Sequence, residues 1–268
     1  MKTKMDFRSR WVLVTGASSG LGKEMACQLA RTHKANLILV ARRVERLQEL
    51  KESLENAYGI QCRIIQADLT NQDDVDRVYH ESVSFGEVYG VILNAGITYF
   101  GKHLSLDWKA FQNMLATNVT SVVRLVHLFV PYLLEKNQGG GIMLISSIAG
   151  FLPVPYQSAY AGTKAFITNF GQSLYQELRD ENISITVFSP GGIATDMTRD
   201  SGLATQFENS VFVQQVEPCA EDALRAMINR RYLSVPGKFN QAQLLLSRLV
   251  PRKVLGFIAA TAYKKALA

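Results

Sequence analysis

The sequence predicts an α/β fold in which helices cover both faces of a central parallel sheet. Short apolar runs alternate with helical patterns along most of the 268 residues, and few breaks interrupt them. The runs are continuously apolar instead of alternating in polarity, which is typical of strands buried on both faces. Because a hydrophobic content of 47% can fill one large core, we expect a single domain over residues 1–268.

The elements are expected from local patterns, in chain order. Strands are predicted for the apolar runs at 12–15, 36–41, 62–67, 88–94, 141–146 and 183–188. Helices are predicted at 22–32, 44–58, 73–84, 107–135, 157–180 and 218–229. Crossovers between parallel strands are right-handed, so this order predicts a doubly wound sheet, whose ligands bind beyond the carboxyl ends of the strands.

The first predicted strand is followed by the sequence TGASSGLG, with the glycine spacing GxxxGxG. Glycines permit a tight turn and a close approach of the backbone to a phosphate. The next helix points its N-terminal amides at the same place. The loop therefore predicts a pyrophosphate cradle of a Rossmann-type dinucleotide site. We expect the cofactor to contact Gly16, Ser18, Ser19, Gly20, Leu21 and Gly22.

The second predicted strand ends at Ala41, which Arg42 and Arg43 follow. An NAD site commonly has Asp or Glu at this strand end to bind the ribose 2′-hydroxyl. A guanidinium can instead bind a 2′-phosphate through two charge-assisted hydrogen bonds. NADP(H) is therefore the expected cofactor, with Arg42 as the 2′-phosphate ligand. The alternative is that both arginines are solvated charges at the start of a helix, and we expect this for Arg43.

Small and polar residues follow the third and fourth strands. Asp68 is placed to accept a hydrogen bond from the adenine amino group, or else stabilises only a local turn. Asn94, Ala95 and Gly96 follow the fourth strand, where small residues keep the floor of the site open for the adenosine ribose. The alternative for Asn94 is a structural link between neighbouring strands.

The helix at 157–180 carries Tyr160 and Lys164, an i, i+4 pair that can point at one substrate. Such a pair is common by chance and gains its meaning from the glycine loop earlier in the chain. The fifth strand ends at Ser146 and Ser147. The turn after the sixth strand can pass close to a flat ring, and its candidate cofactor contacts are Pro190, Gly191, Ile193 and Thr195.

Taken together, these motifs resemble the classical short-chain dehydrogenase/reductase family, of the NADP-preferring type. The resemblance runs from residue 9 to residue 195, with TGASSGLG, the Asn94–Gly96 triplet, Asn118, Ser147, YAGTK and PGGIAT in the family's order. It implies that Tyr160 is the general acid of carbonyl reduction and that Ser147 binds the substrate oxygen. It also implies a homodimer or homotetramer.

The resemblance assigns three further roles. Lys164 would hold the nicotinamide ribose and lower the pKa of Tyr160, which is about 10 in a free tyrosine. Asn118 would hold a water that links Lys164 to solvent. Thr195 would bind the nicotinamide carboxamide.

The composition argues against several other kinds of site. Cys27, Cys62 and Cys219 form no CxxC pair and no Cys/His cluster, so neither disulfides nor a metal site is indicated. The N-terminus has no signal-peptide pattern, and no stretch approaches the roughly 18 uncharged apolar residues of a membrane-spanning helix. A cytoplasmic protein with reduced cysteines is expected.

Two segments bear on the substrate and on partners. A lid is expected at about 196–216, and the residues after the fifth strand offer apolar walls, so a hydrophobic ketone, aldehyde or 3-oxoacyl-type substrate is expected. The C-terminal extension, 235–268, is apolar and basic, and Asp222 is the last acidic residue of the chain. Three hypotheses remain open for it: packing against the domain or a sister subunit, a peripheral membrane contact through anionic lipid, or docking of an acidic substrate carrier.

The sequence thus predicts an NADP(H)-dependent oxidoreductase that interconverts a carbonyl and an alcohol. The alternative is a non-catalytic NADP-binding redox sensor or regulatory protein, against which the complete set of catalytic residue types argues. Nucleic-acid binding through the basic tail is not expected, because no recognition motif accompanies the charges.

Overall fold

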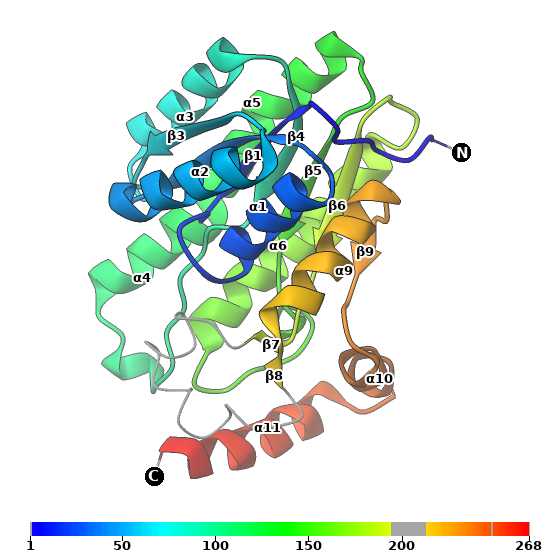
Figure 1. Ribbon diagram of the computed structural model, residues 1–268. Coiled ribbons are helices and arrows are strands. Elements are labelled where there is room, and N and C mark those ends of the chain that lie inside the picture. The colour runs from blue at the N-terminus through cyan, green and yellow to red at the C-terminus, as the bar shows by residue number, and fades with distance from the viewer. Residues whose placement is uncertain (1, 194–212, 248, 268) are drawn as a thin grey trace.

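The computed structural model describes residues 2–193, 213–247 and 249–267, and its centre is a seven-stranded parallel sheet (Figure 1). The strands are β1 (Trp11–Thr15), β2 (Asn36–Ala41), β3 (Cys62–Gln66), β4 (Val88–Leu93), β5 (Gly141–Ile145), β6 (Ser184–Phe188) and β9 (Leu233–Ser234). They lie in the order β3-β2-β1-β4-β5-β6-β9. The strand order reverses between β1 and β4, which is the point at which ligands bind in doubly wound sheets. The predicted fold is confirmed.

Helices cover both faces of the sheet. In chain order, the α-helices of the described residues are α1 (Gly20–Arg31), α2 (Val44–Tyr58), α3 (Gln72–Phe85), α4 (Trp108–Leu115), α5 (Ser121–Lys136), α6 (Ser158–Glu177), α9 (Val216–Ile228), α10 (Lys238–Ser247) and α11 (Arg252–Leu267). One buried cluster joins α1, α2 and α9 to the sheet, and a second joins α3, α5 and α6 to the opposite face. Neighbouring strand residues alternate between the two clusters, as Val12 and Leu13 do, because successive side chains point to opposite faces.

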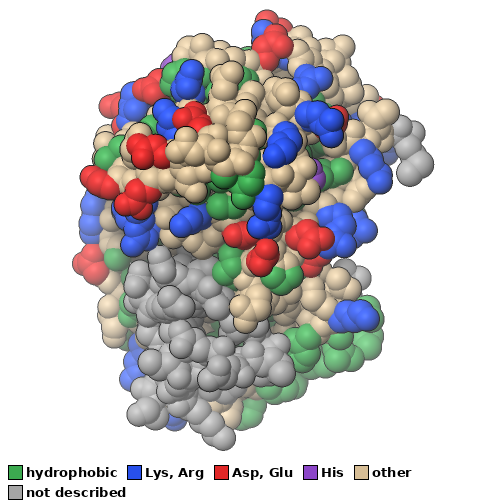
Figure 2. All heavy atoms as spheres, viewed as in Figure 1, with side chains coloured by type: hydrophobic (Ala, Val, Ile, Leu, Met, Phe, Trp, Pro, Cys, Tyr) green, Lys and Arg blue, Asp and Glu red, His purple; other side chains and the backbone are tan. Residues whose placement is uncertain are grey.

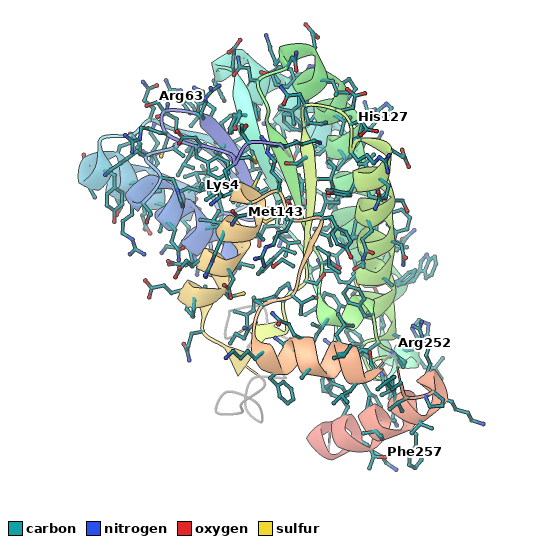
Figure 3. The ribbon with its side chains drawn as sticks, turned by 90° about the vertical axis from the view of Figure 1, so that its right-hand side faces the viewer. Lys4, Arg63, His127, Met143, Arg252 and Phe257 are labelled. Carbon is teal, nitrogen blue, oxygen red and sulfur yellow. The ribbon has the colours of Figure 1, made fainter. Side chains whose placement is uncertain are left out.

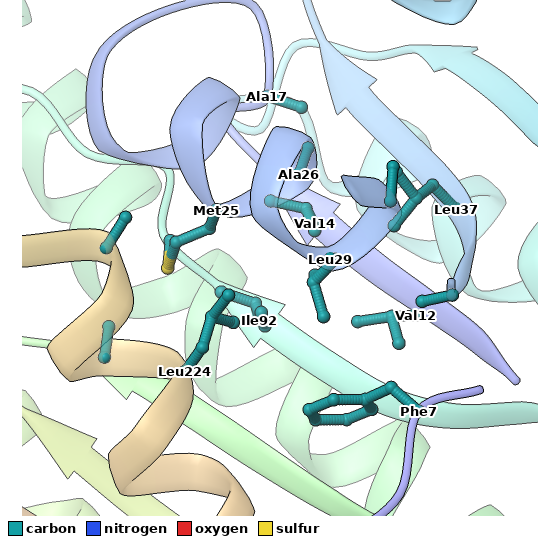
Figure 4. Packing of buried hydrophobic residues seen from close by; sticks show 14 of the residues in the cluster. Phe7, Val12, Val14, Ala17, Met25, Ala26, Leu29, Leu37, Ile92 and Leu224 are labelled. Atoms are coloured by element: carbon teal, nitrogen blue, oxygen red, sulfur yellow. The ribbon is translucent and has the colours of Figure 1, made fainter. Parts of the chain in front are cut away.

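The first cluster fixes the position of α1 on the sheet. Met25 and Leu29 of α1 lie beside Ile92 of β4, and Leu224 of α9 closes the group (Figure 4). Each of these side chains is at most 2% exposed, so α1 is packed tightly between the sheet and α9. This packing matters because the glycine loop connects β1 to α1.

The helix predicted at 107–135 is continuous but irregular. A π-helical turn, η2 (Ala116–Thr120), joins α4 to α5, and the side chain of Asp107 caps the start of α4 by accepting from the amide of Ala110 at 3.0 Å. Single π turns of this kind occur mostly at functional positions in helices. Here the turn contains Asn118.

The same helical stretch, 108–136, is long and apolar enough to cross a membrane by length and composition, contrary to the expectation that no segment would be. In this fold 44% of its most apolar window is buried. Arg124 also forms a two-pronged ion pair with Asp76 of α3, at 2.7 and 2.9 Å. These are the contacts of a helix that packs on the sheet.

The C-terminal part differs in detail from the expectation. The strand β9 is absent from the predicted elements, because two residues are too few for a recognisable pattern. A small second sheet pairs β7 (Gly192–Ile193) with β8 (Val213–Gln214). The expected helical extension is confirmed as α10 and α11. The expected lid, 196–216, falls outside the described residues as far as residue 212.

Candidate functional site

The glycine loop follows β1 and is shaped by close backbone packing. Gly16 and Gly20 have φ values of +68° and +54°, which favour glycine. A Cβ atom at Gly22 would lie 2.4 Å from the carbonyl oxygen of Gly16 and 2.5 Å from Nδ2 of Asn94. Only a residue without a side chain lets α1 start so close to the loop.

The start of α1 offers unpaired donors to an anion. The backbone of Ser19 is extended at the N-cap, but its side chain makes no capping hydrogen bond. The first turn carries no acidic residue. Helix N-termini carry unsatisfied N–H groups and the positive end of the helix dipole, so this end suits a phosphate.

Arg43 is exposed at the start of α2, as expected, but it is also joined to the glycine loop, which was not expected. Its guanidinium donates to the hydroxyl of Ser18 at 3.0 Å and to that of Ser19 at 2.7 Å. No local pattern indicates this contact, because it joins residues 24 and 25 positions apart across two neighbouring parallel strands. The arrangement places a fixed cation at the mouth of the loop.

Arg42 lies on the other side of the same strand end. It lines a pocket beyond β2 and β3 together with Gln66, Ala67, Asp68, Asp74 and Arg77. In the described part of the chain its guanidinium has no hydrogen-bond or ion-pair partner, whereas Arg77 pairs with Asp74 at 2.7 Å and with Glu81 at 3.1 Å. Arg42 is therefore the unpaired cation of this pocket.

Asp68 has the local role that was its alternative. Its Oδ1 accepts from the amide and the hydroxyl of Thr70, both at 3.0 Å, and its own amide donates to Asp74. The carboxylate thus closes the turn before α3 while facing the pocket beside Arg42. The two roles are compatible, since one carboxylate oxygen takes both bonds from Thr70.

Asn94 links the neighbouring strands β1 and β4, as the alternative hypothesis for this residue predicted. Its Nδ2 donates to the backbone oxygen of Thr15 at 3.0 Å. The hydroxyl of Thr15 accepts from the amides of Asn94 and Ala95, also at 3.0 Å. Sequence reasoning missed Thr15, whose position as the last residue of β1 was the available signal. Together the three residues fix the crevice between β1 and β4.

Ser147, Tyr160 and Lys164 converge beyond the carboxyl end of β5. Ser147 is hydrogen-bonded to the side chain of Tyr160. The ammonium of Lys164 lies 5.7 Å from the ring centre of Tyr160 and donates to the backbone oxygen of Ile145 at 2.9 Å. Ser146 points elsewhere, because its hydroxyl donates to the backbone oxygen of Lys164. The structure therefore brings the three expected residues together and leaves Ser146 outside.

Burial dominates the protonation of this group. It raises the pKa of Tyr160 above its ordinary value, and the hydrogen bond from Ser147 lowers that pKa only in part. Burial also lowers the pKa of Lys164 to about 8. The lowering of the Tyr160 pKa by Lys164 stays a prediction, since burial sets the net direction of that pKa in the chain by itself.

Asn118 sits in the π turn, and its side-chain amide both accepts and donates hydrogen bonds within the protein. Its Oδ1 accepts from the amide of Ile97 at 2.8 Å, and its Nδ2 donates to the backbone oxygen of Ile97 and to the hydroxyl of Thr163. A Cβ atom at Gly96 would lie 3.3 Å from Oδ1 of Asn118 and 3.5 Å from Nζ of Lys164. Gly96 therefore lies close to both Asn118 and Lys164, and a side chain at this position would crowd both of them.

The turn after β6 meets both the catalytic group and the C-terminal extension. The oxygen of Pro190 accepts from the amide of Ile148 at 2.9 Å. A Cβ atom at Gly191 would lie 2.7 Å from the amide of Asn240, a buried residue of α10 that sequence reasoning missed. Ile193 lies in β7. Thr195 lies outside the described residues.

The loop after β5 consists mostly of apolar residues. Phe151, Leu152, Val154, Pro155 and Tyr156 are all half-buried. Tyr156 adopts a φ of +67°, a strained conformation of the kind that clusters at functional sites. Its ring centre lies 6.4 Å from that of Phe100, whose ring centre in turn lies 5.7 Å from that of Tyr263 in α11.

Over the described residues, no group of three or more His, Cys, Asp or Glu side chains could hold a metal ion.

Comparisons with known proteins converge on one family. The family model described as short chain dehydrogenase matches residues 10–205. The chain is 35% identical over 192 residues to a 17-beta-hydroxysteroid dehydrogenase type 3 of Mus musculus, covering 71% of this chain and 62% of that protein. It is 30% identical over 195 residues to a very-long-chain 3-oxoacyl-CoA reductase of Anas platyrhynchos, with the same two shares, 71% and 62%. The chain thus spans less than two thirds of the length of these relatives.

Solved structures share the fold along nearly the whole chain. A short-chain dehydrogenase from Sphingobium yanoikuyae in complex with NADPH superposes with a TM-score of 0.80 at 27% identity, covering 91% of this chain and 97% of that one. A short-chain dehydrogenase/reductase from Burkholderia phymatum in complex with NAD superposes with a TM-score of 0.83 at 21% identity, covering 90% and 94%. The second likeness bears on the fold alone.

Proposed function

The chain belongs to the short-chain dehydrogenase family, and from this premise we propose that it is an NADP(H)-dependent oxidoreductase that interconverts a carbonyl and an alcohol. The observation that carries the proposal is the meeting of Ser147, Tyr160 and Lys164 beyond β5, next to the crevice between β1 and β4. A proton donor, a hydroxyl beside it and a cation are the groups that carbonyl reduction requires of the protein.

The residues at the crevice fit a dinucleotide. The glycine loop leaves no room for side chains at Gly16 and Gly22, and the start of α1 keeps its amides uncapped. We propose that the loop residues 16 and 18–22 hold the pyrophosphate, and that Asn94, Ala95 and Gly96 form the floor under the adenosine ribose. Asp68 would take the adenine amino group with the carboxylate oxygen that Thr70 leaves free.

The preference for NADP(H) rests on two arginines. Arg42 is an unpaired cation at the end of β2, and Arg43 is held against the loop by Ser18 and Ser19. Ala41 occupies the position at which a carboxylate would repel a 2′-phosphate. Because two guanidinium groups face the place where the adenosine ribose would lie, we extend the 2′-phosphate site from Arg42 to Arg43.

The chemical roles follow from the geometry of the catalytic group. The nicotinamide ring, when bound, supplies or accepts the hydride. Tyr160 gives its phenol proton to the substrate oxygen in reduction and takes it back in oxidation, while Ser147 positions that oxygen. Because burial raises the pKa of Tyr160, the phenol is protonated at neutral pH, as a proton donor must be.

Lys164 and Asn118 support the donor. We propose that Lys164 holds the nicotinamide ribose and that its ammonium returns a proton toward Tyr160, since a pKa of about 8 lets it exchange protons near neutral pH. Both hydrogens of the Asn118 side-chain amide are engaged within the protein, whereas its Oδ1 accepts one hydrogen bond and has a second acceptor site. A water beside Lys164 would therefore donate to Oδ1 or to the backbone oxygen of Asn118. Pro190, Gly191, Ile193 and Thr195 would line the nicotinamide.

The proposed substrate is a hydrophobic ketone, aldehyde or 3-oxoacyl compound. The half-buried apolar loop 151–156, which leads into α6 with Tyr160, and the ring of Phe100 beside Tyr156 would form apolar walls for it. The names of the relatives, a hydroxysteroid dehydrogenase and a 3-oxoacyl-CoA reductase, agree with a large apolar substrate. We expect NADPH consumption with steroid ketones or 3-oxoacyl thioesters and none with small polar sugars.

A panel of such carbonyl compounds, followed by NADPH absorbance, tests the proposal. Turnover of at least one apolar carbonyl is the expected result. If the chain binds NADPH tightly and no carbonyl or alcohol is turned over, the non-catalytic sensor becomes the better account.

A further inference from the structure

The C-terminal helices present an apolar surface at the edge of the molecule. Besides Phe239, six large apolar side chains of this segment are between 46% and 79% exposed: Leu245, Leu246, Leu249, Val254, Phe257 and Ile258. We call them the C-terminal apolar face. Apolar atoms gather over α10 and α11 at the lower right of Figure 2, and Figure 3 shows Phe257 pointing away from the rest of the protein.

The face is left over after the helix has packed on the protein. The inner side of α11 is occupied, because a Cβ atom at Gly256 would lie 3.7 Å from Pro153 and the ring of Tyr263 contacts that of Phe100. Val254, Phe257 and Ile258 follow the i, i+3, i+4 spacing on the other side of the helix. Packing against the domain therefore accounts for the apolar residues on the inner side of α11. It does not account for those on the outer side, which no other part of the described chain covers.

Positive charge borders this face. Arg252, Lys253 and Lys264 are exposed on α11, and in the described part of the chain none of them has an acidic partner. No Asp or Glu occurs anywhere in the sequence after Asp222. The occupant of the face must therefore combine an apolar interior with a negatively charged boundary.

We propose that the C-terminal apolar face docks the protein on an anionic lipid surface. Leucine, valine, isoleucine and phenylalanine side chains enter the boundary of the acyl chains, and the three basic residues lie at the level of the headgroups. A second copy of this chain is a poorer partner, since a symmetric contact would bring the same positive charges together. Docking in this way would hold the loop 151–156, on which α11 packs, next to the bilayer.

Cosedimentation of the full chain with lipid vesicles tests the proposal. The vesicles consist of phosphatidylcholine alone or of phosphatidylcholine and phosphatidylglycerol in equal parts. The wild type is expected to bind the anionic vesicles and not to bind the neutral ones. The double variant Leu246→Ser/Phe257→Ser and the triple variant Arg252→Gln/Lys253→Gln/Lys264→Gln should each lose binding by roughly tenfold or more.

Matched variants control for unspecific effects. Phe85→Ser/Phe166→Ser removes two exposed rings from α3 and α6. Arg8→Gln/Arg179→Gln/Arg231→Gln removes three exposed cations that precede β1, β6 and β9 at the amino ends of these strands, whereas α10 follows the carboxyl end of β9. Both controls should bind like the wild type. Thermal unfolding by circular dichroism verifies that each variant is folded.

Hydrogen exchange on the wild type provides a readout without substitutions. Anionic vesicles should protect the amides of α10 and α11 and leave those of α2 and α3 unchanged. The proposal is overturned if the wild type does not prefer anionic vesicles or if Leu246→Ser/Phe257→Ser binds them undiminished. It is equally overturned if that variant dissociates an oligomer, or releases an acidic carrier protein, while the wild type ignores vesicles. NADPH binding is measured in parallel, so failure of this proposal is distinct from failure of the proposed activity.

Discussion

Arg43 donates three hydrogen bonds, two to the hydroxyl of Ser18 and one to that of Ser19, and so joins the end of β2 to the glycine loop after β1. The contact restrains both partners before any cofactor binds. A restrained cation loses less conformational freedom when a phosphate arrives, and such preorganisation favours tight binding. Arg42, in contrast, has no side-chain hydrogen bond or ion pair in the described part of the structure and is not restrained in this way.

The two arginines should therefore contribute separately to the NADPH affinity. Arg42→Ala and Arg43→Ala are each expected to weaken NADPH binding by roughly tenfold, since a hydrogen bond to a charged group is worth about 1.5–3 kcal/mol. NADH lacks the 2′-phosphate, so its affinity should change little. Fluorescence titration of both cofactors measures the effect.

Two further variants sharpen this comparison. Arg8→Ala removes an exposed arginine far from the loop and should leave both affinities unchanged. Ser18→Ala should weaken NADPH binding in the wild type and much less in the Arg43→Ala background, because the two residues act through one contact. If Arg42→Ala lowers the affinities for NADPH and NADH equally, Arg42 does not bind the 2′-phosphate.

Gly22→Ala is expected to damage the loop. The added Cβ atom would lie 2.4 Å from the oxygen of Gly16, so α1 or the loop must shift, at a cost of about 1–3 kcal/mol of stability. Gly162→Ala is the matched control in α6, because a Cβ atom there meets no atom within 4 Å. It should stabilise the protein by about 0.4–1 kcal/mol. Urea unfolding of both variants distinguishes these outcomes, and equal stabilities would contradict the packing argument.

Lys164 should cost stability at neutral pH. Its pKa is lowered from 10.5 in a free lysine to about 8 in the folded protein. Between these values the unfolded state binds the extra proton, so this residue makes stability rise as the pH increases from 8 to 10.5. Below pH 8 its full penalty applies, which amounts to about 3 kcal/mol.

Lys164→Met is therefore expected to raise the melting temperature at pH 7 while abolishing turnover. The gain should shrink as the pH rises from 8 toward 10.5, above which the wild-type amine is neutral in both states. Lys109→Met, at an exposed position of α4, provides the comparison and should show no such pH-dependent gain. A melting temperature of Lys164→Met that is lower than that of the wild type at every pH would show that packing around Lys164 outweighs its burial.

The sequence predicted the parts of this structure that local patterns determine. The continuous apolar runs that became β1 to β6 are long enough to be recognised, and the helix 44–58 has the bounds that its charged pattern indicated. The two residues of β9 carry no such pattern, and their pairing with β6 depends on the rest of the sheet.

The candidate site was predictable where a motif lies within one segment. Tyr160 and Lys164 share a helical turn, and Gly16, Gly20 and Gly22 share a loop, so their spacing alone indicated their proximity. The contacts of Arg43 with Ser18 and of Asn240 with Gly191 join distant segments, and only the fold reveals them. The protonation of Tyr160 also escaped prediction, because it depends on how deeply the hydroxyl is buried.

The central claim is that Tyr160 donates the proton in an NADPH-dependent carbonyl reduction. The most direct measurement compares turnover of an apolar ketone by the wild type and by Tyr160→Phe, with NADPH affinity measured on the same samples. We expect turnover to fall by roughly 10²–10⁴-fold, the usual contribution of a positioned proton donor, while NADPH binds with unchanged affinity. If Tyr160→Phe instead reduces the ketone at the wild-type rate, Tyr160 is not the proton donor and the account is contradicted.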